Sequence, residues 1–226
     1  MTGVQTCALP IYDVKEFLSE LLKQLKSIDY IKPEDIPNID LYMDQVTTFM
    51  DEQLAASKRY ESDKILTKTM INNYAKNNLL PSPDKKKYSK EHVLTLLFIY
   101  YFKNILSIND IRSILNPLTE KYFGNDDGFT MQDVYTEVFS LEAEESQKLL
   151  KDLGKKYKIA GETFEDFPDE DQKFLHTFSF ICMLSFDVYI KKMLIERMID
   201  NLNEEKEASS YENTHSGKES KKTGSN

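Results

Sequence analysis

The sequence has few of the residues from which catalytic and metal sites are usually built. Its 226 residues include three histidines and two cysteines, and two cysteines are too few for a disulfide framework. It contains no glycine-rich phosphate loop, Cys-x-x-Cys pair or recognisable Ser-His-Asp arrangement. His176 and Cys182 are six positions apart, about 240° around a helix of 3.6 residues per turn, and would not share a metal. We therefore expect no enzyme activity, no metal and no cofactor.

Long hydrophobic runs are also missing. The longest apolar stretch, residues 178–190, is interrupted by two serines and Asp187, and it is shorter than the roughly 18 to 20 residues of a membrane helix. Cys182 lies in this stretch, where a buried, unreactive thiol is expected. No basic leader followed by an apolar segment opens the chain. We expect a cytoplasmic protein without membrane contact.

Glycine and proline are scarce, at seven residues each, whereas 40% of the residues are hydrophobic and 12% are aromatic. This balance predicts a folded, mostly α-helical chain with a core of one large or two small domains. The formal net charge of −9 would argue against a nucleic-acid partner if the charge were evenly spread. Whether a nucleic-acid partner is plausible therefore depends on where the basic residues lie along the chain.

The first eleven residues, MTGVQTCALPI, show no capping, periodicity or turn that leads into the chain after them. They resemble, letter for letter, the in-frame translation of a common sequencing adapter. A short native leader is the alternative, but this stretch has no basic region and its apolar part is too short. We therefore expect residues 1–11 to be non-native, which leaves Cys182 as the only native cysteine.

The rest of the chain divides into four predicted segments. Residues 12–32 form an N-terminal amphipathic helix, because their apolar positions recur three and four residues apart. Residues 33–118 form a compact domain, and residues 119–203 form a C-terminal helical region that folds as a hairpin. Residues 204–226 are too polar to bury a core and are expected to be disordered.

Helices in the 33–118 domain are predicted from their start and stop residues. Asp40, Thr67 and Ser89 are expected to cap three of them, and Ser107 is expected to open a fourth. The third of these helices is apolar on nearly every side and must therefore be buried. Pro117 is expected to end the fourth helix, because proline removes a backbone donor.

Basic charge is concentrated in one part of this domain. Residues 64–92 contain seven lysines and two acidic residues, a formal +5, whereas residues 130–207 contain ten basic and eighteen acidic residues, a formal −8. A lysine-rich stretch is often only a solvated face. Here it includes a short helix with one wholly polar face, where asparagine can read adenine and lysine can reach guanine or phosphate. The predicted DNA-binding residues are Lys68, Thr69, Asn72, Asn73, Lys76, Lys85, Lys86, Lys87 and Tyr88.

The stretch ILTKTMINNYAKNNLLPSPDKKKYSKEHVLTLLFIYYFKNILSINDIRSIL resembles the winged helix-turn-helix of MerR-type regulators. The likeness runs through a short recognition helix closed by Leu79-Leu80-Pro81, a basic wing ending in Lys87-Tyr88-Ser89, and a long helix containing Phe98-Ile99. The longer stretch from Pro33 to about Asn201 is similar to a Firmicutes family known as a domain of unknown function (YkrK-like). The resemblance implies a MerR-like fold with a small β-wing.

Three features depart from the MerR pattern. Asn72-Asn73-Tyr74 stands where that family usually has Arg-Tyr-Tyr, Asn78 replaces a glycine, and the loop at residues 56–63 is longer than the usual tight turn. The long C-terminal coiled coil of those regulators is not obvious either. The target sequence and the promoter-twisting mechanism are therefore not carried over.

We expect sequence-specific binding of double-stranded DNA by a transcriptional regulator. The alternative is a protein–protein interaction adaptor whose MerR-like core does not bind DNA and whose acidic hairpin carries the function. Residues 130–203 have more apolar surface than one partner helix can cover, which favours a homodimer that encloses an unknown small-molecule effector. Packing of this surface against residues 93–102 is the other possibility.

Overall fold

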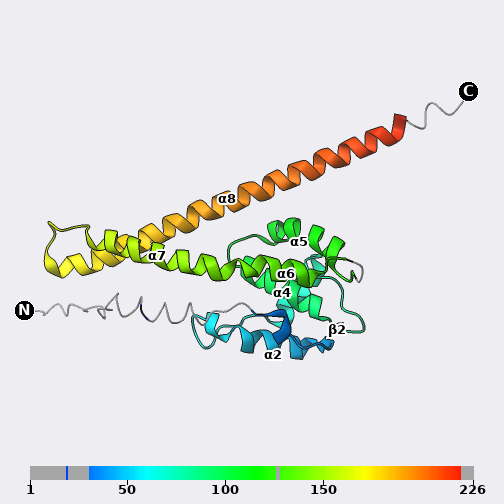
Figure 1. The fold of residues 1–226 in the computed structure, drawn as a ribbon, viewed down its shortest axis with the longest axis horizontal. Helices are drawn as coiled ribbons and strands as arrows, with labels where there is room; N and C mark the ends of the chain where they lie inside the picture. Colours follow the sequence, from blue (N-terminus) through cyan, green and yellow to red (C-terminus); the bar gives the residue numbers. More distant parts are fainter. Residues whose placement is uncertain (1–18, 20–30, 126–127, 220–226) are drawn as a thin grey trace, which may run out of the picture. The chain divides into compact units, whose positions relative to one another are not determined.

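A computed structural model of the chain describes residues 19, 31–125 and 128–219 (Figure 1). The predicted segments 1–11 and 12–32 lie outside the described residues, apart from residues 19, 31 and 32. The structure is mostly helical with one two-stranded antiparallel sheet, which confirms the predicted class. The elements are η1 (Pro33–Asp35), β1 (Leu41–Tyr42), α2 (Met43–Gln53), η2 (Ala55–Ser57), α3 (Lys68–Lys76), β2 (Lys87–Tyr88), α4 (Lys90–Phe102), α5 (Ile108–Tyr122), α6 (Met131–Ser140), α7 (Glu142–Gly161) and α8 (Asp169–Glu219).

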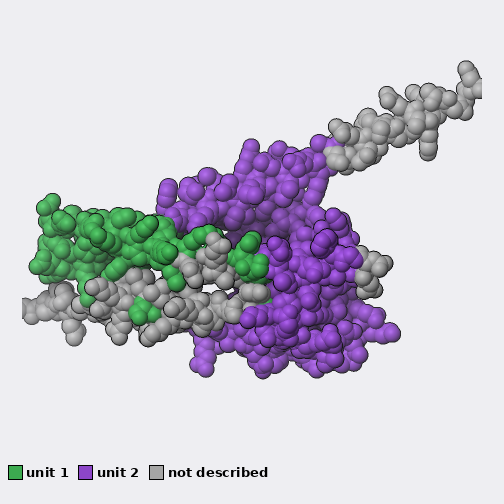
Figure 2. Space-filling model, in the orientation of Figure 1, with its two compact units in different colours: residues 1–31, 139–184 green, residues 32–138, 185–226 purple. Residues whose placement is uncertain are grey.

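The chain divides into two compact units, which are coloured separately in Figure 2. The first unit consists of Met1–Ile31 and Phe139–Leu184, and the second of Lys32–Val138 and Ser185–Asn226. Most of α6 therefore belongs with the helices that precede it. Among the described residues, no helix is both long enough and apolar enough to cross a membrane.

Helix α4 is the centre of the second unit. Every residue from 92 to 100 is buried, as its apolar sequence predicted. Phe98 contacts Tyr135 of α6 edge to face, with the ring centroids 5.5 Å apart. Truncation of a fully buried leucine, such as Leu97, typically costs about 2–5 kcal/mol, so the buried side chains of α4 contribute substantially to the stability of this unit.

The sheet joins two short strands that are far apart in the sequence. Leu41 pairs with Tyr88, and Tyr42 pairs with Lys87, so β2 lies beside the strand that leads into α2. Helix α2 begins after Tyr42, whose N–H donates to Oε1 of Gln45 at 2.8 Å. The prediction that Asp40 caps this helix is wrong, because residues 41 and 42 are taken up by the strand pairing.

Two helices extend further than the sequence predicted. Helix α5 opens with the predicted capping box at Ser107, but it continues through Pro117 to Tyr122. Helix α8 continues to Glu219, where the sequence had predicted a disordered tail from residue 204. No glycine or proline occurs between residues 169 and 216, and residues 204–208 are strong helix formers, so nothing stops the propagation of α8.

The first unit contains the predicted helical hairpin. The predicted C-terminal helical region contains a break at Leu141, which separates α6 from α7. Tyr157 of α7 contacts Phe180 of α8 edge to face, with the ring centroids 5.8 Å apart. Cys182 of α8 is exposed, so the prediction of a buried thiol is wrong, because its side of α8 is not the side that covers α7.

Candidate nucleic-acid interface

Helix α3 is short, and its first turn is capped by the residue that the sequence predicted. The side chain of Thr67 accepts a hydrogen bond from the N–H of Met70 at 3.2 Å, which caps the first turn. Ile71 and Tyr74 are buried, at 0% and 6% exposure, and hold one face of the helix in the core. Met70, the residue before Ile71, is 37% exposed.

The C-terminus of α3 ends in a Schellman-type cap. Asn78 has a φ of 57°, the N–H of Leu79 donates to Tyr74 O at 2.9 Å, and the N–H of Asn78 donates to Ala75 O at 3.2 Å. Glycine is the usual residue at this left-handed position, and asparagine is the next most tolerant. Asn78 therefore occupies a backbone position that glycine commonly fills.

Apart from Met70, the exposed side chains of α3 are polar or basic. All five predicted contact residues of the helix are exposed and none is acidic: Lys68, Thr69, Asn72, Asn73 and Lys76. Lys68 forms an ion pair with Asp44 of α2, and both side chains are well exposed. Exposed pairs of this kind contribute little to stability, so a phosphate could compete for the lysine. The carboxamide oxygen of Asn73 accepts a hydrogen bond from Asn77 at 3.1 Å.

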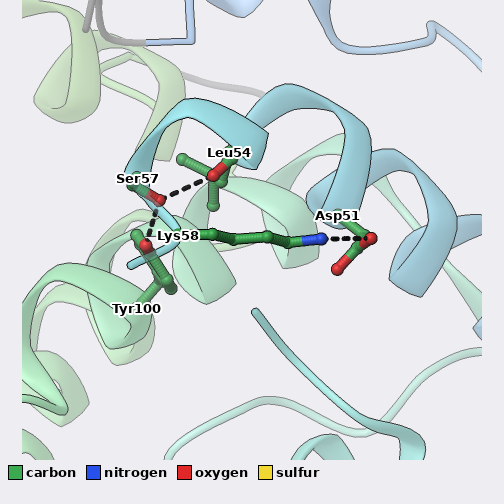
Figure 3. A network of polar contacts seen from close by, with 5 residues as sticks. All are labelled: Asp51, Leu54, Ser57, Lys58 and Tyr100. Carbon is green, nitrogen blue, oxygen red and sulfur yellow. Dashed lines mark hydrogen bonds and ion pairs between the residues drawn. The ribbon is translucent and has the colours of Figure 1, made fainter. Parts of the chain in front are cut away.

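The loop between α2 and α3 is fastened to α4 by a polar network (Figure 3). The hydroxyl of Ser57 donates to Leu54 O at 2.6 Å and is hydrogen-bonded to the hydroxyl of Tyr100 in α4. Lys58 forms an ion pair with Asp51 at 2.7 Å, and this hydrogen bond lowers the pKa of the Asp51 carboxyl. The loop is longer than the tight turn of MerR proteins, but it has fixed anchor points.

A second anchor lies at the other end of this loop. Lys103 donates a hydrogen bond from Nζ to the carbonyl oxygen of Ile65, and its ammonium group lies 5.0 Å from the ring centroid of Tyr100. Burial lowers the pKa of Lys103. The segment between α2 and α3 is therefore held at both ends. Ser57 contacts Tyr100 of α4, and Ile65 contacts Lys103, which directly follows α4.

Lys85, Lys86 and Lys87 lie at the tip of the sheet, in and directly after a tight turn. Lys85 and Lys86 have φ values of 48° and 66°, and the N–H of Lys87 donates to Asp84 O at 2.8 Å. Two consecutive positive φ values in a two-residue connection correspond to a type I′ turn, which favours asparagine and glycine. Lysine at both positions strains the backbone and points two cations out of an exposed tip.

The two residues of β2 face opposite ways. Lys87 is exposed, and its Nζ lies 5.6 Å from the ring centroid of Tyr42. Tyr88 is only 4% exposed, and burial raises the pKa of its phenol. The predicted role of Tyr88 in DNA contact is therefore corrected: side chains alternate along a strand, and this one points into the core.

His92 links the sheet to the start of α4. Its Nδ1 accepts a hydrogen bond from the N–H of Ser89 at 3.0 Å, which completes the capping of this helix. Its ring contacts Tyr88 and Phe123 edge to face, with centroid distances of 5.5 and 4.7 Å. Burial lowers the pKa of His92, against smaller opposing effects of the nearby Ser82 and Pro81 backbone and the Asp40 carboxylate.

The structure groups the predicted contact residues at two places. Five lie on one face of α3, and three lysines lie at the tip of the sheet. Helix α2 contacts both α3 and β2, so one helix supports both groups. The pairing of Leu41 with Tyr88 was missed, since two-residue strands carry no periodicity that a sequence can show.

Residues 31–138 match the family model described as Domain of unknown function (DUF1836). The match begins just before η1, ends within α6, and includes α3 and the turn at Lys85 and Lys86. No curated protein and no solved structure matches the chain. Residues 31–138 are thus similar to DUF1836 domains, and helices α7 and α8 lie outside the matched residues.

Proposed function

We propose that residues 33–118 bind double-stranded DNA as a MerR-like winged helix-turn-helix. Helix α3 enters the major groove, and the turn at Lys85 to Lys87 contacts the phosphate backbone. In this role the protein is a non-enzymatic transcriptional regulator of the cytoplasm.

The observation that carries this proposal is the exposed face of α3. Five adjacent side chains there are polar or basic and none is acidic, in a chain whose net charge is −9. The opposite face is anchored by Ile71 and Tyr74, so the polar face is held rigidly. Asn72 has a side chain suited to bidentate contact with adenine.

The strained turn supports the same proposal. A type I′ turn is most stable with Asn-Gly, so Lys85-Lys86 costs stability at this position. Backbone strain at an exposed site is typical of residues kept for an interaction. Two cations at the tip of a small sheet suit a DNA backbone.

Recovery of bound fragments from a whole genome, followed by titration of the recovered site, tests the proposal. Asn72→Ala should reduce discrimination for that site by about 1–3 kcal/mol while leaving non-specific binding unchanged. Changing Lys85, Lys86 and Lys87 to Gln should weaken binding to all sequences and reduce the salt slope by about 0.9 for each lost phosphate contact.

A matched control changes the same number of lysines elsewhere. Lys151, Lys155 and Lys158 are exposed on α7 in the first unit, and their triple Gln variant should bind DNA like the parent protein. If the two triple variants lose the same affinity, general charge explains the binding and the assigned interface is wrong. Recovery of no fragment above background also contradicts it.

A second candidate function, protein–protein interaction through α8, is favoured by a separate observation. Several large apolar side chains of this helix are well exposed, among them Phe186 at 64% and Tyr189 at 62%. Surfaces of this kind usually contact another protein. We propose that the partner is a second copy of the chain, because two recognition helices read a longer DNA site than one. An adaptor without DNA binding would use the same surface for a different protein.

A further inference from the structure

A pocket of about 310 Å³ lies in the second unit, between α5 and the C-terminal part of α8. Its lining includes Arg112, Asn116 and Glu120 of α5, together with Asn203 and Lys206 of α8. Binding sites for small molecules typically begin at roughly 300 Å³. The size therefore suits a compact metabolite.

Pro117 gives this pocket an unusual wall. Proline has no N–H, so it cannot donate to the carbonyl oxygen of Ser113 four residues earlier in α5. Lys206 of α8 supplies the missing donor, with its Nζ 2.8 Å from Ser113 O. Ser113, Pro117 and Lys206 all line the pocket, so the missing helix hydrogen bond and its replacement donor lie in the same wall.

The side chain of Asn116 contains a buried oxygen atom, Oδ1, that lacks a hydrogen-bond donor among the described residues. A buried acceptor that is left unsatisfied is destabilising, and native proteins keep few of them. Asn116 is itself a residue of the pocket wall, and a rotation of its side chain would bring this oxygen to a bound donor.

The charges of the wall select the kind of ligand. Arg112 and Lys206 are cations that suit a carboxylate, and guanidinium groups bind carboxylates in a paired geometry. The carboxylate of Glu120 and the unsatisfied oxygen of Asn116 are acceptors that suit an N–H or O–H donor. One small molecule that satisfies both sides carries a carboxylate and an ammonium group.

We propose that this pocket binds a free α-amino acid, with its carboxylate on Arg112 and Lys206 and its ammonium group on Asn116 and Glu120. The site goes beyond the proposed DNA binding and does not depend on it. Because α5 and α8 both line the pocket, the ligand joins the DUF1836 domain to the helix that follows it.

The test measures thermal stability and calorimetric binding of the full chain with each proteinogenic L-amino acid at millimolar concentration. Alkyl carboxylates without an amine and alkyl amines without a carboxylate are the comparison ligands. We expect at least one amino acid to raise the Tm saturably with one site per chain, and neither comparison class to do so. No shift with any amino acid, or an equal shift with the carboxylates alone, overturns the proposal.

Two variants locate the site. Arg112→Gln should weaken binding at least about tenfold, which is the effect of losing one charged contact of 1.4 kcal/mol. The matched change Arg197→Gln, on α8 but outside the pocket wall, should leave the affinity unchanged. Equal affinity in the parent and Arg112→Gln proteins would place the ligand elsewhere and overturn the assignment.

Asn116→Leu separates loss of binding from loss of folding. Removal of an unsatisfied buried acceptor should raise the Tm of the ligand-free protein, while the amino acid no longer produces a shift. A variant that is more stable and does not bind cannot be explained by misfolding. An Asn116→Leu protein that still binds the ligand as tightly as the parent contradicts the proposed role of this side chain.

Discussion

The phenol ring of Tyr88 packs edge to face on the imidazole of His92, with the ring centroids 5.5 Å apart. This contact joins the strand behind the lysine tip to the first turn of α4, the most buried helix of the second unit. The tip is therefore not an independent arm. His92 contacts Tyr88 of β2 and also caps the first turn of α4, so a change in its charge affects both the strand and the helix.

Acidification should destabilise the second unit through His92. Burial lowers the pKa of this group in the folded state, so its contribution is full above the unfolded pKa of about 6.5 and is lost as the pH falls through the lowered folded value. For a single titrating group, the free energy of unfolding changes by no more than about 1.4 kcal/mol per pH unit. Denaturant unfolding at a series of pH values between 7.5 and 5.5 measures it. His92→Gln keeps a capping side chain without the titration, and should show a shallower pH dependence.

Replacing Lys85-Lys86 by Asn-Gly should affect stability and DNA affinity in opposite directions. The new residues suit positive φ, and relief of the strained turn should stabilise the fold by about 1–2 kcal/mol. The loss of two cations should weaken DNA binding. Chemical denaturation and DNA titration of the same preparation measure both effects. If stability falls, the turn is not of the type described.

Asn78 should tolerate only one kind of replacement. Asn78→Gly keeps the left-handed cap of α3 and should leave stability within a few tenths of a kcal/mol or raise it slightly. Asn78→Ala should destabilise the protein by about 1 kcal/mol, because alanine has a Cβ and no side chain that stabilises this conformation. Thermal unfolding of the two variants compares them directly, and equal stability would refute the cap.

Pro117 and Lys206 should be energetically coupled. Lys206→Met leaves Ser113 O without its donor and should cost about 0.5–1 kcal/mol, since the bond is exposed. In a Pro117→Ala background the alanine N–H can take that carbonyl, so the same Lys206→Met change should cost almost nothing. A double-mutant cycle of unfolding free energies measures the coupling. Additive effects would contradict the pairing.

The exposed apolar side of α8 should hold two chains together. Sedimentation equilibrium at micromolar concentration should give twice the 26.4 kDa mass of the chain. Phe186→Glu and Tyr189→Glu together should return it to a monomer, whereas Asn201→Glu, also exposed on α8, should not. A monomeric parent protein that still protects a single half-site on DNA contradicts the dimer.

The parts of the fold that could be predicted from sequence are those determined by local chemistry. The Thr67 cap, the capping box at Ser107 and the all-round burial of α4 follow from residue types a few positions apart. The polar face of α3 was predictable for the same reason, because helical periodicity places its members on one side.

The features that could not be predicted depend on partners distant in sequence. Tyr88 is buried because β2 pairs with a strand 46 residues earlier, at Tyr42 and Leu41. Pro117 is tolerated inside α5 because Lys206, in another helix, replaces the lost donor. The strain at Lys85 and Lys86 was equally invisible, since no local preference of lysine predicts positive φ.

The fastening of the α2–α3 loop at Ser57 and Ile65 also has a kinetic consequence. A recognition segment whose backbone is already ordered loses little conformational entropy when a partner arrives, so encounter does not wait for a folding step. For the proposed DNA binding, the association rate should then be governed by diffusion and by attraction between the lysines and the phosphates, and should fall steeply as salt is added. Discrimination between partners appears in the lifetime of the complex, because a rigid surface releases a poorly fitting partner quickly.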